Sequence, residues 1–245
     1  MKNSSSPVSF PSFKAVFAWV LLGLISAPSL QAQNTPLNDS NFNTARNLWF
    51  SDQASAIATY GHIRDWNVTG VTNMSQAFKD KTTFDENITG WDVSNVTNMA
   101  DMFRGATSFN QPIGDWNVSS VTSMTCMFLG ASTFNQPIAH WDTSKVTRME
   151  YMFSQAGTFN QPIGNWDTSK VTRMHYMFNA ASVFNQPIAD WNVSSVTNMG
   201  SMFNGASSFN KPISDWNTSS VTDLNRMFTN ATSFNQDLSS WEISN

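Results

Sequence analysis

The sequence predicts an α/β repeat protein, a solenoid in which every 25-residue unit adds one short parallel strand and one short helix. Three observations favour this fold: tryptophan recurs at a constant interval, apolar residues alternate around it, and a helical spacing of apolar residues follows. The tryptophans that set the register are Trp66, Trp91, Trp116, Trp141, Trp166, Trp191, Trp216 and Trp241. A constant period of this length indicates units that each bury an apolar face against their neighbours.

Residues 1–32 are expected to be a secretory signal peptide. Lys2 and Lys14 precede the apolar run AVFAWVLLGLI, and the small-residue stretch SAPSLQAQ follows it, with cleavage expected after Ala32. The run is too short to span a bilayer, which takes about 20 residues as a helix. The sequence therefore predicts a secreted or cell-surface protein with no transmembrane segment in the mature chain.

Residues 33–63 differ from the repeats and are expected to form a linker and an N-terminal helical cap. Phe42, Ala45 and Trp49 fit one face of a helix, and Asp39 or Ser40 could cap its start. The exposed end of a solenoid needs such a cover. Residues 64–245 then hold seven full repeats and a partial eighth.

The strand of each unit is predicted around the tryptophan. Ile113, Trp116, Val118 and Val121 reproduce the L-x-x-L-x-L spacing of a leucine-rich repeat, with Trp and Val in place of Leu. The alternation of Trp116 and Val118 predicts a short strand with one face inward. Stacked strands of this kind would form a parallel sheet.

The helix of each unit is predicted immediately afterwards. Met99, Met102, Phe103 and Ala106 follow the i, i+3, i+4, i+7 spacing, and Thr97 stands where an N-cap belongs. In the loop that follows, a phenylalanine is expected to point into the core and a proline prevents the helix from continuing.

The unit FNQPIGDWNVSSVTNMxxMFxGASS resembles the repeat of the BspA-like surface proteins, which include a domain of unknown function first noted in Mycoplasma surface lipoproteins. The resemblance covers roughly residues 60–245. It implies a right-handed, leucine-rich-repeat-like solenoid displayed outside the cell, with adhesion or ligand binding as its role. It implies no enzymatic activity, no catalytic residues and no cofactor.

Several repeated columns are predicted to be structural. Methionine recurs at the two positions typified by Met99 and Met102, as expected for core filling. An asparagine recurs in every loop, where stacked amides can hydrogen-bond from one unit to the next. This asparagine column comprises Asn110, Asn135, Asn160, Asn185, Asn210 and Asn235.

One candidate binding surface is the outward face of the predicted strands. Its short polar side chains could hydrogen-bond a glycan or a protein loop, or they could simply be the wet side of a half-buried sheet. The residues are Asp115, Asn117, His140, Asp142, Asn165, Asp167, Asp190 and Asn192.

The second candidate surface is a cationic and aromatic patch. Two central units carry the same residue types one repeat apart, so stacking makes them neighbours; Tyr and Arg are favoured at interaction hot spots. The patch comprises Lys145, Arg148, Glu150 and Tyr151 with Lys170, Arg173, His175 and Tyr176. It would bind an anionic or protein ligand, unless a duplicated unit merely copied its surface.

Other functional classes are disfavoured. A net charge of -4 provides no basic field for nucleic acid. The three histidines show no metal-ligand spacing, and no catalytic motif is present. We therefore expect a non-enzymatic protein that binds an extracellular protein or glycan. The alternatives are a glycan-binding or glycan-acting protein that uses the Asp/Asn surface and, more remotely, an ice-binding protein that uses the threonine column containing Thr97.

Overall fold

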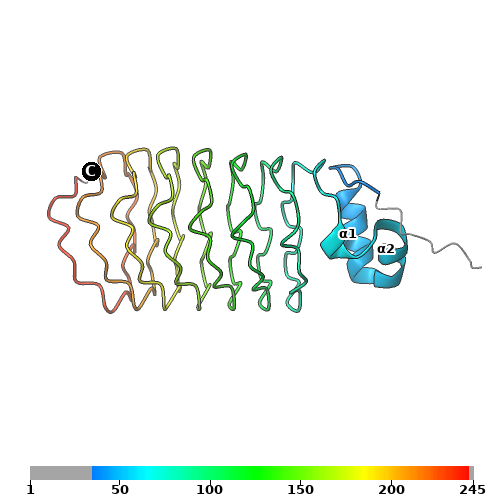
Figure 1. Cartoon of the computed structure of the whole chain (residues 1–245). Helices are drawn as coiled ribbons and strands as arrows, with labels where there is room; N and C mark the ends of the chain where they lie inside the picture. Colours follow the sequence, from blue (N-terminus) through cyan, green and yellow to red (C-terminus); the bar gives the residue numbers. More distant parts are fainter. Residues whose placement is uncertain (1–34, 243–245) are drawn as a thin grey trace, which may run out of the picture. The chain divides into compact units, whose positions relative to one another are not determined.

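The computed structural model describes residues 35–242, which form two short helices followed by a stack of coils (Figure 1). The helices are α1, Phe42–Ser51, and α2, Gln53–Tyr60, and a 3-10 turn, η1, spans Ile63–Asp65. The expected signal peptide lies outside the described residues.

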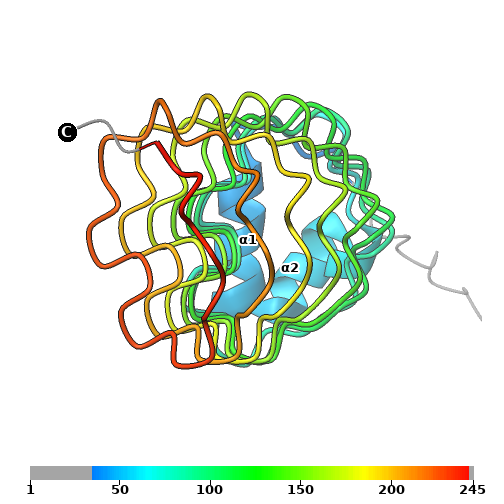
Figure 2. The ribbon, with the colours of Figure 1, turned by 90° about the vertical axis from the view of Figure 1, so that its left-hand side faces the viewer.

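Neighbouring coils are related by a shift of 25 residues. A single parallel bridge joins each coil to the next, always at the same position of the repeat. The bridge residues are Asn73, Asn98, Ser123, Arg148, Arg173, Asn198 and Asp223. Viewed along the stack, successive coils follow nearly the same path (Figure 2). Equivalent residues of the repeat therefore become neighbours in space.

The core consists of columns of stacked side chains. Phe103 lies parallel to Phe128 of the next coil, with ring centroids 5.6 Å apart, and to Phe109 of its own coil at 3.9 Å. Met99 and Met102 have no exposed surface. The predictions that the Trp, Phe and Met columns form the core are thus confirmed, and burial of these large side chains is the main source of stability.

The predicted strands are wrong. No strand is present in residues 35–242, where the parallel β pairing between coils consists of isolated bridges. Trp116 and Val118 point inward as expected, but turns close on both sides of them: Trp116 N–H bonds to Ile113 O at 3.2 Å, and Val121 N–H bonds to Val118 O at 2.8 Å. Alternating burial arises here from two successive turns, so the α/β leucine-rich-repeat fold class is contradicted.

The predicted helix of each repeat is also wrong; in the described part of the chain α1 and α2 are the α-helices. Asp101 and Gly105 have φ of 57° and 67°, in the left-handed region that interrupts a right-handed helix. Met99 N–H donates to Ser123 O of the next coil at 3.0 Å, whereas Met102 N–H closes a local turn to Met99 O at 3.2 Å. The backbone alternates between these two kinds of bond, which buries the same residues that a helix face would bury.

Two side-chain columns complete the bonding between coils. Thr97 is not a helix cap, because its N–H and Oγ1 both donate to Thr72 O, at 2.8 and 3.2 Å. The asparagine ladder is confirmed: Asn135 N–H donates to Asn110 Oδ1 at 3.0 Å, and the same bond recurs in the next four coils. These bonds satisfy backbone donors that the turns leave unpaired.

The segment that contains α1 packs against the first coil. Phe42, Ala45 and Trp49 are buried along one face of α1, as predicted. Asp39 and Ser40 do not cap this helix, whose N-cap position is held by Asn41 without a side-chain bond. The Asp39 carboxylate instead accepts bonds from Thr72 N–H, at 2.9 Å, and from Thr72 Oγ1, at 2.6 Å. It thereby replaces the threonine carbonyl that a preceding coil would supply.

Candidate functional site

Two adjacent coils carry a set of large polar and aromatic side chains that other coils lack. Coil 141–165 and coil 166–190 bring together six of the residues predicted from sequence. We call this set the tyrosine face: Arg148, Glu150, Tyr151, Arg173, His175 and Tyr176. Because equivalent positions are neighbours, the face is a direct product of the 25-residue register.

The two tyrosines form the centre of this face. The rings of Tyr151 and Tyr176 are parallel within 4°, with centroids 4.6 Å apart. The imidazole of His175 contacts Tyr151 edge-on, at 5.3 Å between centroids. Both phenol rings are half-buried. The result is a rigid aromatic cluster that a ligand can contact without first ordering flexible side chains.

Arg148 is committed to an ion pair within the face. Its Nε and Nη2 donate to Glu150 Oε1 at 2.8 and 2.5 Å, and only 3% of Glu150 is exposed. Glu150 Oε2 is buried and has no hydrogen-bond partner among the described residues. Arg148 therefore compensates a buried charge, and its own charge is largely neutralised by Glu150.

His175 contributes no charge to the face at neutral pH. Burial lowers the pKa of His175 below its ordinary value, and the nearby Glu150 carboxylate opposes this only in part. Its Nδ1 is buried and unpartnered within residues 35–242. Arg173 is exposed and forms no ion pair with the described residues. The predicted cationic patch thus reduces to one guanidinium beside an aromatic cluster.

The two predicted lysines belong to a different surface. Lys145 and Lys170 are exposed and act electrostatically on Asp142, and Lys170 also acts on Asp167. We call these four residues the aspartate edge. The sequence placed all the cations in one patch, but two residues of turning backbone separate each lysine from the arginine that follows it.

The Asp and Asn side chains of this surface are used by the backbone. Asp142 Oδ1 accepts from Ser144 N–H at 3.0 Å, and Asn117 and Asn192 accept equivalent bonds at 3.1 Å. A hydrogen bond from the Ser144 side chain is the main reason why the pKa of Asp142 is lowered, and the bond from the Ser144 backbone N–H adds to it. The recurring bond shows a structural role in tightening a turn.

The remaining predicted residues of the first candidate surface lie just before each tryptophan. Asp115, His140 and Asp190 are exposed, as is Asn165. Equivalent positions alternate between acid, imidazole and amide, and the structure brings no further functional group to them. They form a solvent-exposed column.

Small residues beside the tyrosine face create two hollows that sequence analysis missed. One, of about 130 Å³, opens over Gly200 and Ser201 and includes Tyr176 and Arg226 in its walls. The other, of about 480 Å³, lies on the opposite side of the face and reaches Arg148. The signal was available in the sequence: Gly200 and Ser201 follow His175 and Tyr176 by one repeat.

Comparison with known families gives a match over most of the chain. The profile described as "Mycoplasma protein of unknown function, DUF285" matches residues 43–165 and 151–245. The chain belongs to this family. A search of curated proteins finds no match.

The DUF285 match agrees with part of the resemblance seen in the sequence. It supports the repeat family whose name refers to Mycoplasma. Membership in DUF285 supplies no activity, ligand or site residue, and the absence of strands in residues 35–242 contradicts the leucine-rich-repeat geometry expected from the BspA-like unit.

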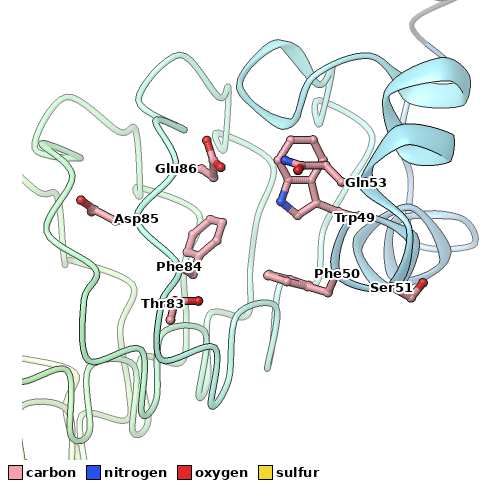
Figure 3. Close-up of a pocket in the computed structure, with 8 residues that line it drawn as sticks. All are labelled: Trp49, Phe50, Ser51, Gln53, Thr83, Phe84, Asp85 and Glu86. Carbon is pink, nitrogen blue, oxygen red and sulfur yellow. The ribbon is translucent and has the colours of Figure 1, made fainter.

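A further pocket lies where the first DUF285 coil meets α1 and α2. It has a volume of about 510 Å³, and Trp49, Phe50, Phe84, Asp85 and Glu86 are among its lining residues (Figure 3). Lys81 Nζ lies 4.3 Å from the centroid of the Phe50 ring. Asp85 accepts a bond from Asn110 N–H at 2.9 Å and so begins the asparagine ladder. The acidic pair Asp85-Glu86 distinguishes the first coil from the later ones. The later DUF285 repeats have Asn-Gln at these two positions, except for one repeat with Asn-Lys.

Three further properties of the described residues concern metal binding, thiol reactivity and membrane insertion. Residues 35–242 hold no group of three or more His, Cys, Asp or Glu side chains placed to bind a metal ion. Burial raises the pKa of the Cys126 thiol to about 11, so it is a poor nucleophile at neutral pH. Neither α1 nor α2 has the length and apolar character needed to cross a membrane, and no other described helix does.

Proposed function

We propose that this chain is an exported, non-enzymatic binding protein that contacts an extracellular protein or glycan with the tyrosine face. The observation that carries the proposal is the stacked pair of Tyr151 and Tyr176, which occurs on the face where the coils differ most. Tyr and Arg dominate binding energy at interaction hot spots, and a preformed cluster lowers the entropy lost on binding.

Variation within the repeat supports this choice of surface. The column that contains the tyrosines reads Gln76, Asp101, Cys126, Tyr151, Tyr176, Ser201 and Arg226. By contrast, the columns that hold the coils together are nearly constant. In repeat proteins, the invariant positions build the scaffold, so a ligand must be distinguished by the variable ones.

The non-enzymatic part of the proposal rests on the state of the reactive groups. The Glu150 carboxylate is paired with Arg148, His175 Nδ1 is shielded from solvent, and Cys126 is held as a thiol. Export is supported by the signal-peptide pattern of residues 1–32, and adhesion at a surface by the resemblance of the unit to BspA-like proteins.

The experiment is binding of the full chain to glycan and protein arrays, followed by measurement of the affinity of each hit. The triple variant Tyr151→Ser, Tyr176→Ser and Arg173→Ser is expected to bind at least about 100-fold more weakly, because it removes the hot-spot residues without exposing Glu150. Arg148 is left intact for that reason.

The control changes residues far from the tyrosine face. Gln76→Ser alters the tyrosine column in a distant coil, and Arg64→Ser removes an exposed cation. Both should bind as the unmodified chain does. Undiminished binding by a folded triple variant would remove the tyrosine face as the site.

A further inference from the structure

A hollow lies next to the tyrosine stack. One face of Tyr176 is covered by Tyr151, and its other face is turned toward coil 191–215, where the equivalent residue is Ser201. Beyond Ser201 the same column carries Arg226. The hollow of about 130 Å³ lies between Tyr176 and Arg226, with Gly200 at its base.

The spacing of the column suits one inserted ring. Tyr176 and Arg226 are two coils apart, and the Tyr151–Tyr176 ring spacing of 4.6 Å, doubled, gives a separation of about 9 Å. A ring held between two surfaces needs about 7 Å, which is two van der Waals contacts of roughly 3.5 Å. A ligand ring would therefore continue the stack between Tyr176 and Arg226, over Ser201, which is itself only 3% exposed.

The walls of the hollow are polar and fixed. Asn198 Nδ2 donates to Asp223 Oδ2 at 2.9 Å, Gly200 N–H donates to Asn198 Oδ1 at 2.9 Å, and Asn225 N–H donates to Asp223 Oδ1 at 2.9 Å. An ionised carboxylate has about four acceptor positions, so Asp223 keeps some for a ligand. The amide of Asn225 and the guanidinium of Arg226 line the same space and add donors.

We propose that this hollow binds one pyranose ring of a glycan. The C–H face of the sugar lies against Tyr176, and its hydroxyl groups exchange hydrogen bonds with Asp223, Asn225 and Arg226. The proposal rests on the proposed function, whose ligand class it narrows from protein or glycan to glycan. A phenyl or indole ring from a protein partner fits less well, because it would bury the polar groups of Asp223 and Arg226 without bonding them.

The direct test uses three probes, the methyl glycosides of a neutral hexose, an N-acetylhexosamine and a hexuronic acid. Saturation-transfer NMR with the full chain should detect at least one of them. We expect Kd on the order of 1 mM, since a ligand of about a dozen non-hydrogen atoms can gain little affinity. In an amide spectrum, the signals of Gly200 and Asn225 should shift on titration.

The decisive variant is Ser201→Tyr, which fills the hollow with the ring already present one coil earlier. The backbone accommodates it, because φ is 56° at Ser201 and 59° and 60° at Tyr176 and Tyr151. Binding of the glycoside should fall at least 10-fold. The matched control Gln76→Tyr places the same side chain in the same column, where φ is 61°, and should leave binding within 2-fold.

The outcomes separate this proposal from the broader one. No binding by any of the three glycosides, shifts that map elsewhere than Gly200 and Asn225, or full binding by Ser201→Tyr would each overturn the sugar site. If an array ligand is still lost in the triple tyrosine-face variant, the proposed function survives that failure. An array ligand that ignores the triple variant would overturn both proposals, because Tyr176, which that variant removes, also forms a wall of the sugar site.

Discussion

The aspartate edge and the tyrosine face lie on the same two coils but use their polar groups differently. At the edge, Asp142 and Asp167 each accept a bond from the backbone of the serine two residues later. On the face, Arg148, Glu150 and His175 contact other side chains, and two polar atoms remain unpartnered within the described residues. A bond that recurs in every coil indicates a structural role, whereas contacts confined to two coils mark the part of the surface that is free to serve binding.

Arg148→Ser should have the largest effect on stability. It leaves Glu150, which is 3% exposed, as a buried charge without a partner, and we expect a loss of about 2–3 kcal/mol in the free energy of unfolding. Urea denaturation measures this loss. Arg173→Ser serves as the control and should stay within about 0.5 kcal/mol, as expected for an exposed side chain.

A double variant checks that the loss of stability in Arg148→Ser comes from the unpaired Glu150 charge. Replacing both Arg148 and Glu150 by Ser should restore most of the lost stability, because no buried charge then remains. Equal losses in Arg148→Ser and Arg173→Ser would show that the ion pair does not distinguish the two coils.

Asp142→Ala tests the aspartate edge. Removing the acceptor of Ser144 N–H should cost about 0.5–1 kcal/mol in urea denaturation. Asp142→Asn keeps an acceptor, as Asn117 does in its own coil, and should be nearly neutral. Ligand binding should be unchanged in both variants; a folded Asp142→Ala chain that had lost binding would place the site on the edge.

The response to acid should also come from carboxylates that cap backbone groups. Hydrogen bonds lower the pKa of Asp39, Asp92, Asp142 and Asp167 below the ordinary value of 3.8. Since the unfolded chain then binds more protons, the stabilisation is complete above pH 3.8 and is lost as the pH falls through the lower folded values.

Thermal unfolding from pH 6 downward measures the acid effect, with Asp39→Asn as the comparison. Asp39 accepts bonds from Thr72 and Asn73, so its replacement by a group that does not titrate should flatten the acid limb of the curve. An unchanged acid limb would mean that other groups dominate.

Replacing Lys145 and Lys170 by Ser should have the smallest effect. Both lysines act on Asp142 and lie outside the tyrosine face, so the double variant should bind any array ligand within about 2-fold of the unmodified chain. Salt-sensitive loss of binding in this variant would join the two surfaces into one site, as the sequence pattern alone suggested.

The sequence by itself determined which side chains are buried and which repeat positions become neighbours. The 25-residue period set the register of the Trp, Phe and Met columns and of the asparagine ladder, and it brought Tyr151 next to Tyr176. These conclusions depend only on hydrophobic spacing and periodicity, both of which can be read from a single amino-acid sequence.

Only the tertiary structure decided the path of the backbone and the final grouping of charges. Residues in the left-handed backbone conformation, such as Asp101 and Tyr151, turn the chain where the apolar spacing predicted a helix. Hydrogen bonds to the next coil, which the sequence does not display, offset the conformational energy of these residues. Three features follow from those turns. Arg148 pairs with Glu150, the lysines lie at the aspartate edge instead of beside the arginines, and a hollow forms over Gly200. Local spacing cannot predict them, because burial patterns are the same for a helix and for a chain of alternating turns.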